Sequence, residues 1–308
     1  MAASMQNDVH RLVARPRQPN HLVGMRSALR WAVAAGSLSG CFALVATRPL
    51  SEGGPPLRGT AIVTGGGRGI GAACSRKLAE KGYGVVIAYR ADETAAAAVA
   101  ADIRATGGLA ATCRADVAQE TDVKALFTFA DSAFGKSSPL KVLVNNAGVL
   151  GPKGPLSEVG TADQLHEVMA TNVAGPLLCC REAERRMSTL EGGEGGSIVQ
   201  ISSGSAYIGT PLLYAASKGA LNSLTIGMVK PMAQAGIRIN TVSPGMTSTD
   251  MVAETAKTFD WSQIPLGRIG EPDEIANTVV WLCSDEASYV CGANVRVAGG
   301  RPPGTTLG

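Results

Sequence analysis

The stretch Thr60-Ala-Ile-Val-Thr-Gly-Gly-Gly-Arg-Gly-Ile-Gly71 joins a short apolar run to a glycine-rich turn, and an alanine- and lysine-bearing helix follows until Gly82 ends it. The apolar run predicts a buried strand. Glycines at 65, 69 and 71 carry no Cβ, so backbone N–H groups could approach a pyrophosphate at the helix N-terminus. The spacing is Gly-x-x-x-Gly-x-Gly, and a tight turn without a ligand is the alternative.

Beyond this stretch, apolar runs and helical patterns alternate along the rest of the chain. Strict alternation predicts one doubly wound (Rossmann) parallel sheet of about seven strands, with right-handed crossovers and helices on both faces. The expected strands are 60–63, 85–89, one ending at 115–116, 140–144, 197–201, 237–242 and 293–297. After the first helix, the expected helices are 93–106, 120–134, 162–187, 214–235 and 272–284.

Length and composition favour one α/β domain, residues 57–308, with an N-terminal appendage. The chain has 308 residues, of which 45% are hydrophobic and 17% charged, as in ordered globular proteins. Residues 1–50 carry six arginines and the single acid Asp8, so the +3 of the whole chain leaves the body slightly negative. The body therefore offers no basic surface for nucleic acid.

Residues 1–56 are rich in alanine, serine and arginine and end in the linker Ser51-Glu-Gly-Gly-Pro-Pro56. This composition predicts a targeting segment, with transit to a mitochondrion or plastid as the first choice and a cytoplasmic protein otherwise. Residues 31–47 are uncharged and moderately apolar, although shorter than the ~20 residues of a membrane span. A signal anchor and a disordered extension remain as alternatives.

The cysteines and histidines do not predict a metal site or a hydrolytic triad. Seven cysteines occur without C-x-x-C spacing, and small buried thiols in a reducing compartment are expected. His166 is the single histidine of the body, because His10 and His21 lie in the extension. A zinc site or a Ser-His-Asp triad would have to be built around one residue without a motif.

Tyr214 and Lys218 stand four residues apart in a predicted helix, and so share one face. An ammonium near a phenol favours the phenolate, so the tyrosine pKa is expected to fall toward the working pH from its usual value of about 10. Such a tyrosine can exchange a proton with an alcohol or carbonyl oxygen. The alternative is a solvated lysine beside a packed tyrosine.

The end of the second predicted strand bears on the choice of cofactor. Enzymes that prefer NAD often carry an acid there, which binds the ribose 2′-hydroxyl, whereas this chain has Tyr89 and then Arg90. Together with Arg68 in the glycine turn, two guanidinium groups could pair with a 2′-phosphate. NADP(H) is therefore favoured over NAD(H), and two solvated arginines are the alternative.

These motifs, taken together, resemble the short-chain dehydrogenases/reductases from about residue 58 to 300. The motifs that carry the resemblance are Thr64–Gly71, Asn145-Asn-Ala-Gly148, Asn172, Ser202-Ser203, Tyr214-x-x-x-Lys218 and Pro244-Gly245, in that order. Within the family the chain looks most like bacterial-type glucose dehydrogenase and 3-oxoacyl-carrier-protein reductase relatives. Many of these have unknown substrates.

The resemblance implies a role for each matching position. Tyr214 would be the general acid/base, Lys218 would hold the nicotinamide ribose, Ser203 would bind the substrate oxygen, and Asn172 would position a water that links Lys218 to a proton relay. The implied cofactor-binding residues are Thr64, Gly65, Arg68, Gly69, Ile70, Gly71, Tyr89, Arg90, Asp116, Val117, Asn145, Ala147, Tyr214, Lys218, Pro244, Gly245, Thr247 and Thr249.

Two departures from the family pattern bear on the site and the assembly. Ser203 lies eleven residues before Tyr214, whereas about thirteen are common, which could tilt the serine or pass its role to Ser202. Pro231 falls inside the predicted Tyr214 helix and should kink it or end it early. That helix commonly packs across a subunit interface in the family, where homodimers or homotetramers are expected.

The sequence thus predicts an NADP(H)-dependent oxidoreductase that moves hydride between nicotinamide and a secondary alcohol or ketone. A nucleotide-binding sensor or scaffold without turnover is the alternative. Apolar residues before Tyr214 and in the loop after Pro244 suggest a mixed, partly apolar substrate pocket, or else they pack the loops. These residues are Tyr207, Ile208, Leu212, Leu213 and Trp261.

Overall fold

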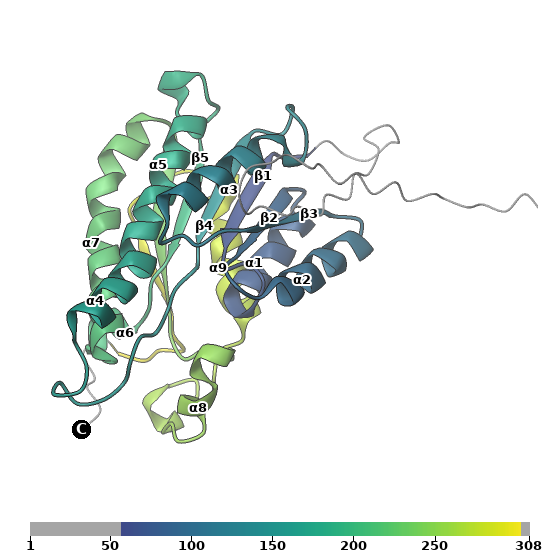
Figure 1. The fold of residues 1–308 in the computed structure, drawn as a ribbon. Coiled ribbons are helices and arrows are strands. Elements are labelled where there is room, and N and C mark those ends of the chain that lie inside the picture. Colours follow the sequence, from purple (N-terminus) through teal and green to yellow (C-terminus); the bar gives the residue numbers. More distant parts are fainter. Residues whose placement is uncertain (1–56, 303–308) are drawn as a thin grey trace, which may run out of the picture. The chain divides into compact units, whose positions relative to one another are not determined.

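The structure of the chain, a computed structural model, describes residues 57–302. At its centre lies a parallel sheet of seven strands in the order β3-β2-β1-β4-β5-β6-β7 (Figure 1). The strands are β1 (Thr60–Thr64), β2 (Gly84–Tyr89), β3 (Leu109–Arg114), β4 (Leu140–Asn145), β5 (Gly196–Ile201), β6 (Ile237–Pro244) and β7 (Asn294–Val297). The doubly wound sheet predicted from the sequence is confirmed.

Helices cover both faces of the sheet. Against one face pack α1 (Gly69–Glu80), α2 (Glu93–Ala105) and α9 (Pro272–Cys283). Against the other pack α3 (Glu120–Ala133), α5 (Gly175–Met187) and α7 (Leu212–Gln234). Shorter helices are α4 (Ala162–Met169), α6 (Ser205–Ile208) and α8 (Ala253–Ala256).

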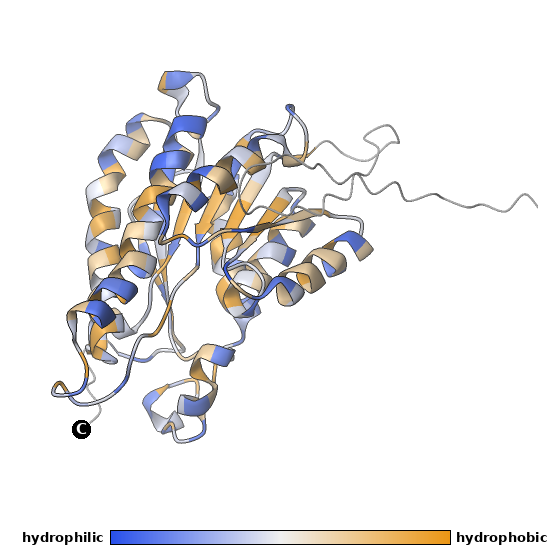
Figure 2. Cartoon of the chain, viewed as in Figure 1, coloured by the Kyte–Doolittle hydropathy of each residue, from blue (hydrophilic) through white to orange (hydrophobic). Residues whose placement is uncertain are grey.

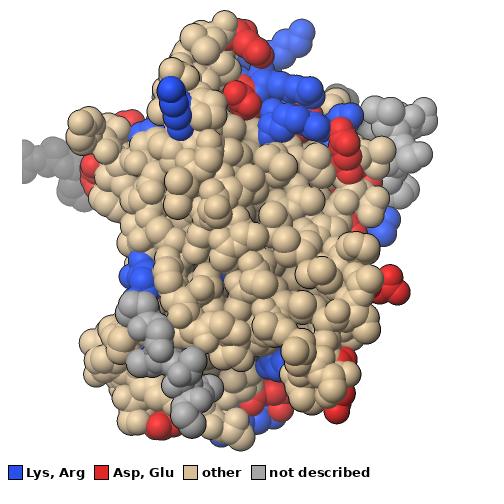
Figure 3. All heavy atoms as spheres, turned by 90° about the vertical axis from the view of Figure 1, so that its left-hand side faces the viewer, with Lys and Arg blue, Asp and Glu red and all other residues tan. Residues whose placement is uncertain are grey.

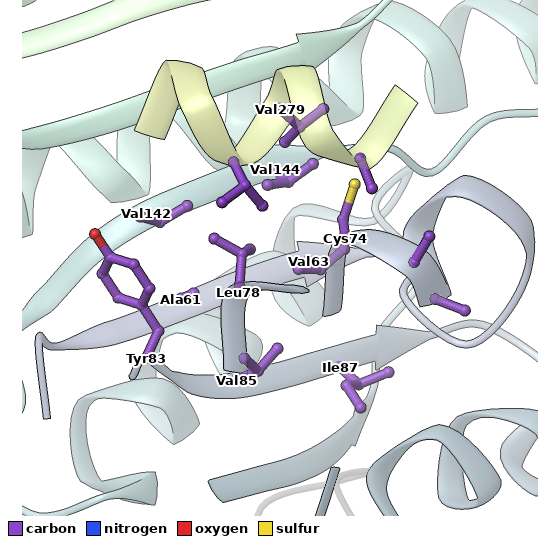
Figure 4. Packing of buried hydrophobic residues seen from close by; sticks show 14 of the residues in the cluster. Ala61, Val63, Cys74, Leu78, Tyr83, Val85, Ile87, Val142, Val144 and Val279 are labelled. Atoms are coloured by element: carbon purple, nitrogen blue, oxygen red, sulfur yellow. The ribbon is translucent and has the colours of Figure 1, made fainter. Parts of the chain in front are cut away.

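Apolar strands form the core between these two helical layers. In Figure 2 the strands are mostly hydrophobic, whereas the helices carry hydrophilic residues on their outer sides. Figure 4 shows Leu78 of α1 and Val279 of α9 packed over Val63, Val85 and Val144 of three neighbouring strands. All five side chains are fully buried, which is the large favourable term that holds this layer on the sheet.

The strand order reverses beside β1, which pairs with β2 on one side and with β4 on the other. The chain therefore leaves β3 at one edge of the sheet and returns to its middle at β4. Loops that follow β1 and β4 diverge to opposite faces at this point, and this is where doubly wound proteins bind ligands. The glycine turn after β1 and the Asn-Asn-Ala-Gly segment after β4 meet here.

Sequence and structure differ in two helices. The stretch predicted as one helix over 162–187 is divided into α4, a π-helical turn at Ala170–Ala174, and α5. Pro231 was expected to kink its helix or end it early, and the early end is wrong, because α7 continues to Gln234. A proline removes only its own bond to the preceding turn, and the turn after it still forms, since the Ala235 N–H donates to the Pro231 carbonyl at 3.1 Å.

The predicted targeting segment 1–56 and the apolar stretch 31–47 lie outside the described residues. Within residues 57–302, no helix is long and apolar enough to cross a membrane.

Candidate active site

The glycine turn between β1 and α1 is too tight for a side chain at its last glycine. A Cβ on Gly71 would lie 2.2 Å from the carbonyl oxygen of Gly65 and 2.5 Å from the Asn146 amide nitrogen. Gly65 and Gly69 have φ angles of 62° and 50°, which favour glycine. The turn therefore brings its backbone close to whatever lies against it.

The N-terminus of α1 is open to an anion. Its N-cap residue, Arg68, makes no side-chain capping bond, and its first turn carries no acidic residue. The first N–H groups of a helix have no partner within the helix, and together with the helix dipole they attract negative charge. This end of α1, framed by glycines, fits the pyrophosphate of a dinucleotide cofactor.

The two arginines predicted to recognise a 2′-phosphate differ in their surroundings. Arg68 is largely exposed, with carboxylate oxygens of Asp92 and Asp250 at 3.8 and 3.7 Å. Arg90 is exposed after β2, whereas Tyr89 is buried. Both guanidinium groups are thus accessible at this edge, and Arg68 has two weak contacts that a phosphate could replace.

Tyr214 and Lys218 lie in the first two turns of α7, as predicted, and both are almost fully buried. The Lys218 Nζ atom lies 5.5 Å from the centroid of the Tyr214 ring and donates to the carbonyl oxygen of Ile201 at 2.7 Å. Among the described residues no acidic side chain forms a salt bridge with Lys218. A buried lysine without a counter-ion points to a functional site.

Burial moves the pKa values of the two groups in opposite directions. Loss of hydration raises the pKa of Tyr214 to about 12, against a smaller lowering by a hydrogen bond from Ser203. The same cause lowers the pKa of Lys218 to about 8. In the chain alone the pKa of Tyr214 is therefore raised and not lowered as expected, because desolvation of the phenolate is its largest cause.

Ser203, and not Ser202, is the serine beside the phenol. The Ser203 hydroxyl lies near enough to the Tyr214 phenol to lower its pKa, and it accepts from the backbone N–H of Ser205 at 3.0 Å. Ser202 is buried and donates to the carbonyl oxygen of Lys218. The shortened connection between Ser203 and Tyr214, which includes α6, therefore keeps the serine at the site.

Asn172 lies in the π-helical turn between α4 and α5 and is fully buried. Its carboxamide accepts from the Val149 N–H and donates to the Val149 carbonyl, each at 2.9 Å, and also donates to the Ser217 hydroxyl at 2.9 Å. π turns inside helices are frequently found at functional sites. Here the turn ties the loop after β4 to the α7 helix next to Tyr214.

The Asn145 side chain, predicted to lie at the cofactor, points away from the glycine turn. It is buried against α5, where its amide nitrogen lies 3.4 Å from the Pro176 carbonyl and 3.5 Å from the Cys180 sulfur. Strand side chains alternate between faces, and position 145 points to the α5 layer. The neighbouring Asn146, missed by sequence reasoning, donates to the carbonyls of Thr64 and Gly65 at 3.0 Å and braces the glycine turn. The second asparagine of the Asn-Asn-Ala-Gly motif was the sequence signal that could have identified this residue.

The remaining predicted cofactor residues follow the carboxyl ends of β1, β3, β4 and β6, which point to the same side of the molecule because the strands are parallel. Several of them brace the loops on that side. The Thr64 hydroxyl accepts from the Ala147 N–H at 3.1 Å, and the Asp116 carboxylate accepts from the Ala118 N–H at 3.0 Å. The rest are Ile70, Val117, Pro244, Gly245, Thr247 and Thr249.

A cleft of about 690 Å³ opens beside the glycine turn. Its walls include Gly67–Gly69 on one side and Ser248–Asp250, after β6, on the other. Tyr214 and Lys218 do not line it. The cleft therefore lies beside Arg68 and not beside the phenol. Within residues 57–302, no group of three histidines, cysteines or acids is placed to hold a metal ion.

Comparisons with known proteins agree with this geometry. Residues 65–301 match a family model described as enoyl-(acyl carrier protein) reductase. An uncharacterized oxidoreductase of Escherichia coli, YgfF, is 43% identical over 248 residues, which are 78% of this chain and 99% of that protein. The 3-oxoacyl-[acyl-carrier-protein] reductase FabG of Staphylococcus aureus is 35% identical over 78% of this chain and 97% of its own.

Solved structures show the same likeness. A dehydrogenase/reductase from Sinorhizobium meliloti aligns with a TM-score of 0.72 at 36% identity, over 80% of this chain and 95% of that one. A short-chain dehydrogenase from Burkholderia cenocepacia in complex with NADP aligns with a TM-score of 0.70 at 33% identity, over 80% and 98% of the two chains. The chain therefore belongs to the short-chain dehydrogenase/reductase family and is an NAD(P)-dependent oxidoreductase.

Proposed function

We propose that this enzyme interconverts a secondary alcohol and a ketone with Tyr214 as general acid/base and with NADP(H) as the preferred cofactor. The observation that carries the proposal is the cluster of Ser203, Tyr214 and Lys218. A buried phenol lies beside a serine hydroxyl and one helical turn before a buried lysine that has no acidic partner among residues 57–302. The nicotinamide, when bound, supplies the hydride chemistry.

The side chains handle the proton and the charge on the substrate oxygen. At neutral pH Tyr214 is protonated, so its hydroxyl can donate to a carbonyl oxygen that is becoming an alkoxide. The Ser203 hydroxyl provides a second donor at the same place. Once the phenol has given up its proton, Lys218, still mostly charged below pH 8, stabilises the phenolate. Oxidation of the alcohol runs through the same groups in reverse.

The preference for NADP(H) rests on Arg68 and Arg90. Both guanidinium groups are accessible at the carboxyl edge of the sheet, and the position after β2 carries no acid to hold a ribose 2′-hydroxyl. Asp92 and Asp250 lie beside Arg68, so a 2′-phosphate would take the place of these carboxylates. The Burkholderia relative, solved with NADP, makes this cofactor the first to test.

The test is a panel of carbonyl compounds with the full chain, NADPH and NADH, followed by the absorbance of the reduced nicotinamide. The panel includes a 3-oxoacyl thioester, because of the FabG likeness, and a 4-oxocyclohexanecarboxylate. The latter is included because a cis-4-hydroxycyclohexanecarboxylate dehydrogenase of Sinomonas cyclohexanicum is 39% identical. Oxidation of NADPH with at least one ketone supports the proposal. Tight NADPH binding without oxidation across the panel would favour the alternative, a nucleotide sensor or scaffold.

A homodimer through α7 is part of the proposal. Exposed apolar side chains on this helix include Leu212 and Ile226, and Leu177 is exposed on α5. The face shown in Figure 3 has Lys and Arg gathered at its upper rim and few charged side chains across its middle. Large exposed apolar surfaces mark protein interfaces. Ile226→Glu should therefore yield a smaller species by analytical ultracentrifugation, whereas an unchanged sedimentation coefficient would contradict this interface.

For residues 1–56 we propose a role in organellar targeting, which their arginine-rich, acid-poor composition supports. A fusion of this segment to a fluorescent protein, observed in plant or animal cells, tests it. Diffuse cytoplasmic fluorescence would argue against targeting.

A further inference from the structure

The chain between β6 and α9, residues 245–271, forms a lobe beyond the carboxyl edge of the sheet, with α8 at its far end (Figure 1). Residues 245–271 are all described, and of their apolar side chains only Ile264 is buried. The two stems of the lobe are joined to each other, because Ser248 donates to the Gly270 carbonyl at 2.8 Å and Gly270 to the Met246 carbonyl at 2.9 Å. A segment with so little buried surface depends on a few contacts for its position.

The lobe adjoins the catalytic loop. Gly204, which follows Ser203, donates its N–H to the carbonyl oxygen of Pro244 at 2.8 Å, directly before the lobe begins. On the other side, the Lys153 ammonium from the loop after β4 donates to the Thr255 hydroxyl in α8 at 2.8 Å. The lobe therefore begins beside the loop that carries Ser203 and is also joined to the loop after β4.

The main support of the lobe is the short segment after β7, Ala298–Arg301. The Leu266 N–H donates to the carbonyl oxygen of Gly299 at 3.0 Å. Gly299 has a φ of 59°, and a Cβ there would lie 2.6 Å from an Ile264 methyl group. The backbone of this segment and the lobe thus meet at a distance that only glycine permits.

Arg301 extends this contact with its side chain. Its guanidinium carbon lies 5.2 Å from the centroid of the Phe259 ring, and one guanidinium nitrogen donates to the Gln263 side chain at 3.0 Å. Phe259 packs edge-to-face on Trp261 with a centroid distance of 5.0 Å. Among the described residues Arg301 forms no salt bridge. Its guanidinium group instead contacts the Phe259 ring and the Gln263 amide of the lobe.

Arg301 is itself connected to the serine loop. The Arg296 guanidinium donates to the Arg301 carbonyl oxygen, and its carbon lies 5.3 Å from the centroid of the Tyr207 ring in α6. Tyr207 follows Ser203 by one helical turn. Arg296 of β7 and Arg301 therefore join the loop that carries the serine to the aromatic residues of the lobe. The sequence spacing does not reveal this arrangement.

We propose that Arg301 is a positioning residue that latches the lobe next to Ser203 through Phe259 and Gln263, and thereby sets the affinity for the carbonyl substrate. This inference rests on the proposed function for its effect on catalysis, but not for the latch itself.

Steady-state kinetics of the full-length Arg301→Met variant give the first test, because methionine keeps an apolar stem and removes the charge. Cation–π contacts of this kind correspond to roughly three- to thirtyfold in an equilibrium constant, so the KM for the ketone should rise by about that factor. The kcat and the dissociation constant of NADPH should stay within about twofold, since Arg301 contacts neither Tyr214 nor the glycine turn. Arg301→Lys should restore part of the KM, because an ammonium also interacts with an aromatic face.

A matched control comes from the same lobe. Arg268 is exposed and binds Glu274 of α9 at 2.8 Å, away from Phe259. Arg268→Met should leave the KM unchanged. If Arg301→Met proves unstable, Phe259→Leu removes the same contact from the other side and should raise the KM similarly.

Trp261 gives a readout that needs no turnover. In a Trp31→Phe, Trp281→Phe background Trp261 is the remaining one of the chain's three tryptophans, and Arg301→Met should shift its emission. The same change should speed tryptic cleavage at the exposed Lys257 of the lobe. If no ketone of the panel were reduced, the proposed function would be rejected. The Trp261 emission and the cleavage at Lys257 would still test the latch, because neither needs turnover. Unchanged Trp261 emission and Lys257 cleavage would overturn the latch, and so would a loss of kcat at constant KM.

Discussion

The Lys218 ammonium lies 5.5 Å from the centre of the Tyr214 ring, and both side chains are buried. Burial acts on them in opposite directions: it raises the pKa of the phenol to about 12 and lowers the pKa of the amine to about 8. Near neutral pH the site therefore holds a protonated phenol beside a mostly charged amine. This is the pair of states from which a proton can be given to a substrate oxygen and the resulting phenolate stabilised.

Replacement of Tyr214 by phenylalanine should abolish most turnover while leaving cofactor binding intact. The change removes one hydroxyl, and loss of a positioned acid/base group costs roughly 10² to 10⁴ in rate. NADPH affinity, measured by fluorescence titration, should change by less than about threefold, because the glycine turn and both arginines are untouched. Tyr289→Phe, at a fully exposed tyrosine, is the control. A Tyr214→Phe enzyme with wild-type kcat would refute the assignment.

The buried Lys218 should make stability depend on pH above 8. In the folded chain its pKa is about 8, whereas the ordinary value is 10.5, so between these values the unfolded chain binds the extra proton. The free energy of unfolding must then rise with pH across this window. From the size of the pKa difference, the rise is roughly 3 kcal/mol as an upper limit.

Lys218→Met isolates this effect, because every other titrating group is common to the two proteins. Urea unfolding at a series of pH values between 7.5 and 10.5 should show the wild type gaining stability relative to the variant as the pH increases. Tyr214 acts in the opposite sense above pH 10, and it does so in both proteins. A difference that stays flat over the series would mean that Lys218 titrates normally in the folded chain.

Much of the fold could be predicted from the sequence because each element signals itself locally. The apolar run 60–63 and the glycines that follow fix β1 and its turn, and Gly82 ends α1 where predicted. Tyr214 and Lys218 could be paired because both stand on one helix, where spacing determines proximity.

What could not be predicted depends on contacts between distant segments. The pKa of Tyr214 follows from how completely the folded chain buries it, which spacing does not reveal. The orientation of Asn145 depends on which face of β4 meets α5. The Asn172 side chain, in the π turn, is held by bonds to Val149 and Ser217, which are 23 and 45 residues away in the sequence.

The choice of cofactor should depend on Arg68 and Arg90. Charge-assisted hydrogen bonds contribute about 1.5 to 3 kcal/mol, so alanine at both positions should raise the KM for NADPH roughly ten- to a hundredfold. The KM for NADH, which lacks the 2′-phosphate, should change by less than about threefold by the same reasoning. Arg58→Ala is the control, because Arg58 binds Asp285 at 3.0 Å just before β1, at the amino ends of the strands and away from the glycine turn. Equal losses with both cofactors would show that the arginines do not read the 2′-phosphate.

Alanine at Gly71 should damage the cofactor site, and alanine at Gly219 should not. A Cβ at position 71 would lie 2.2 Å from the Gly65 carbonyl oxygen, so the turn would have to open, at a cost of about 1 to 3 kcal/mol. At Gly219, inside α7 and one residue after Lys218, a Cβ meets nothing within 4 Å. Alanine there should leave stability unchanged or raise it by up to about 1 kcal/mol.

Urea unfolding and NADPH titration of the two alanine variants separate a local defect in the turn from a general effect of adding a methyl group. Gly71→Ala should lose both stability and NADPH affinity, since the open turn displaces the N–H groups at the start of α1 from the phosphate position. Gly219→Ala should bind NADPH as the wild type does, despite its place next to a catalytic residue. If Gly71→Ala bound NADPH normally, the tight turn would serve only the packing of α1 against Asn146, and the phosphates would have to be held elsewhere on the edge of the sheet.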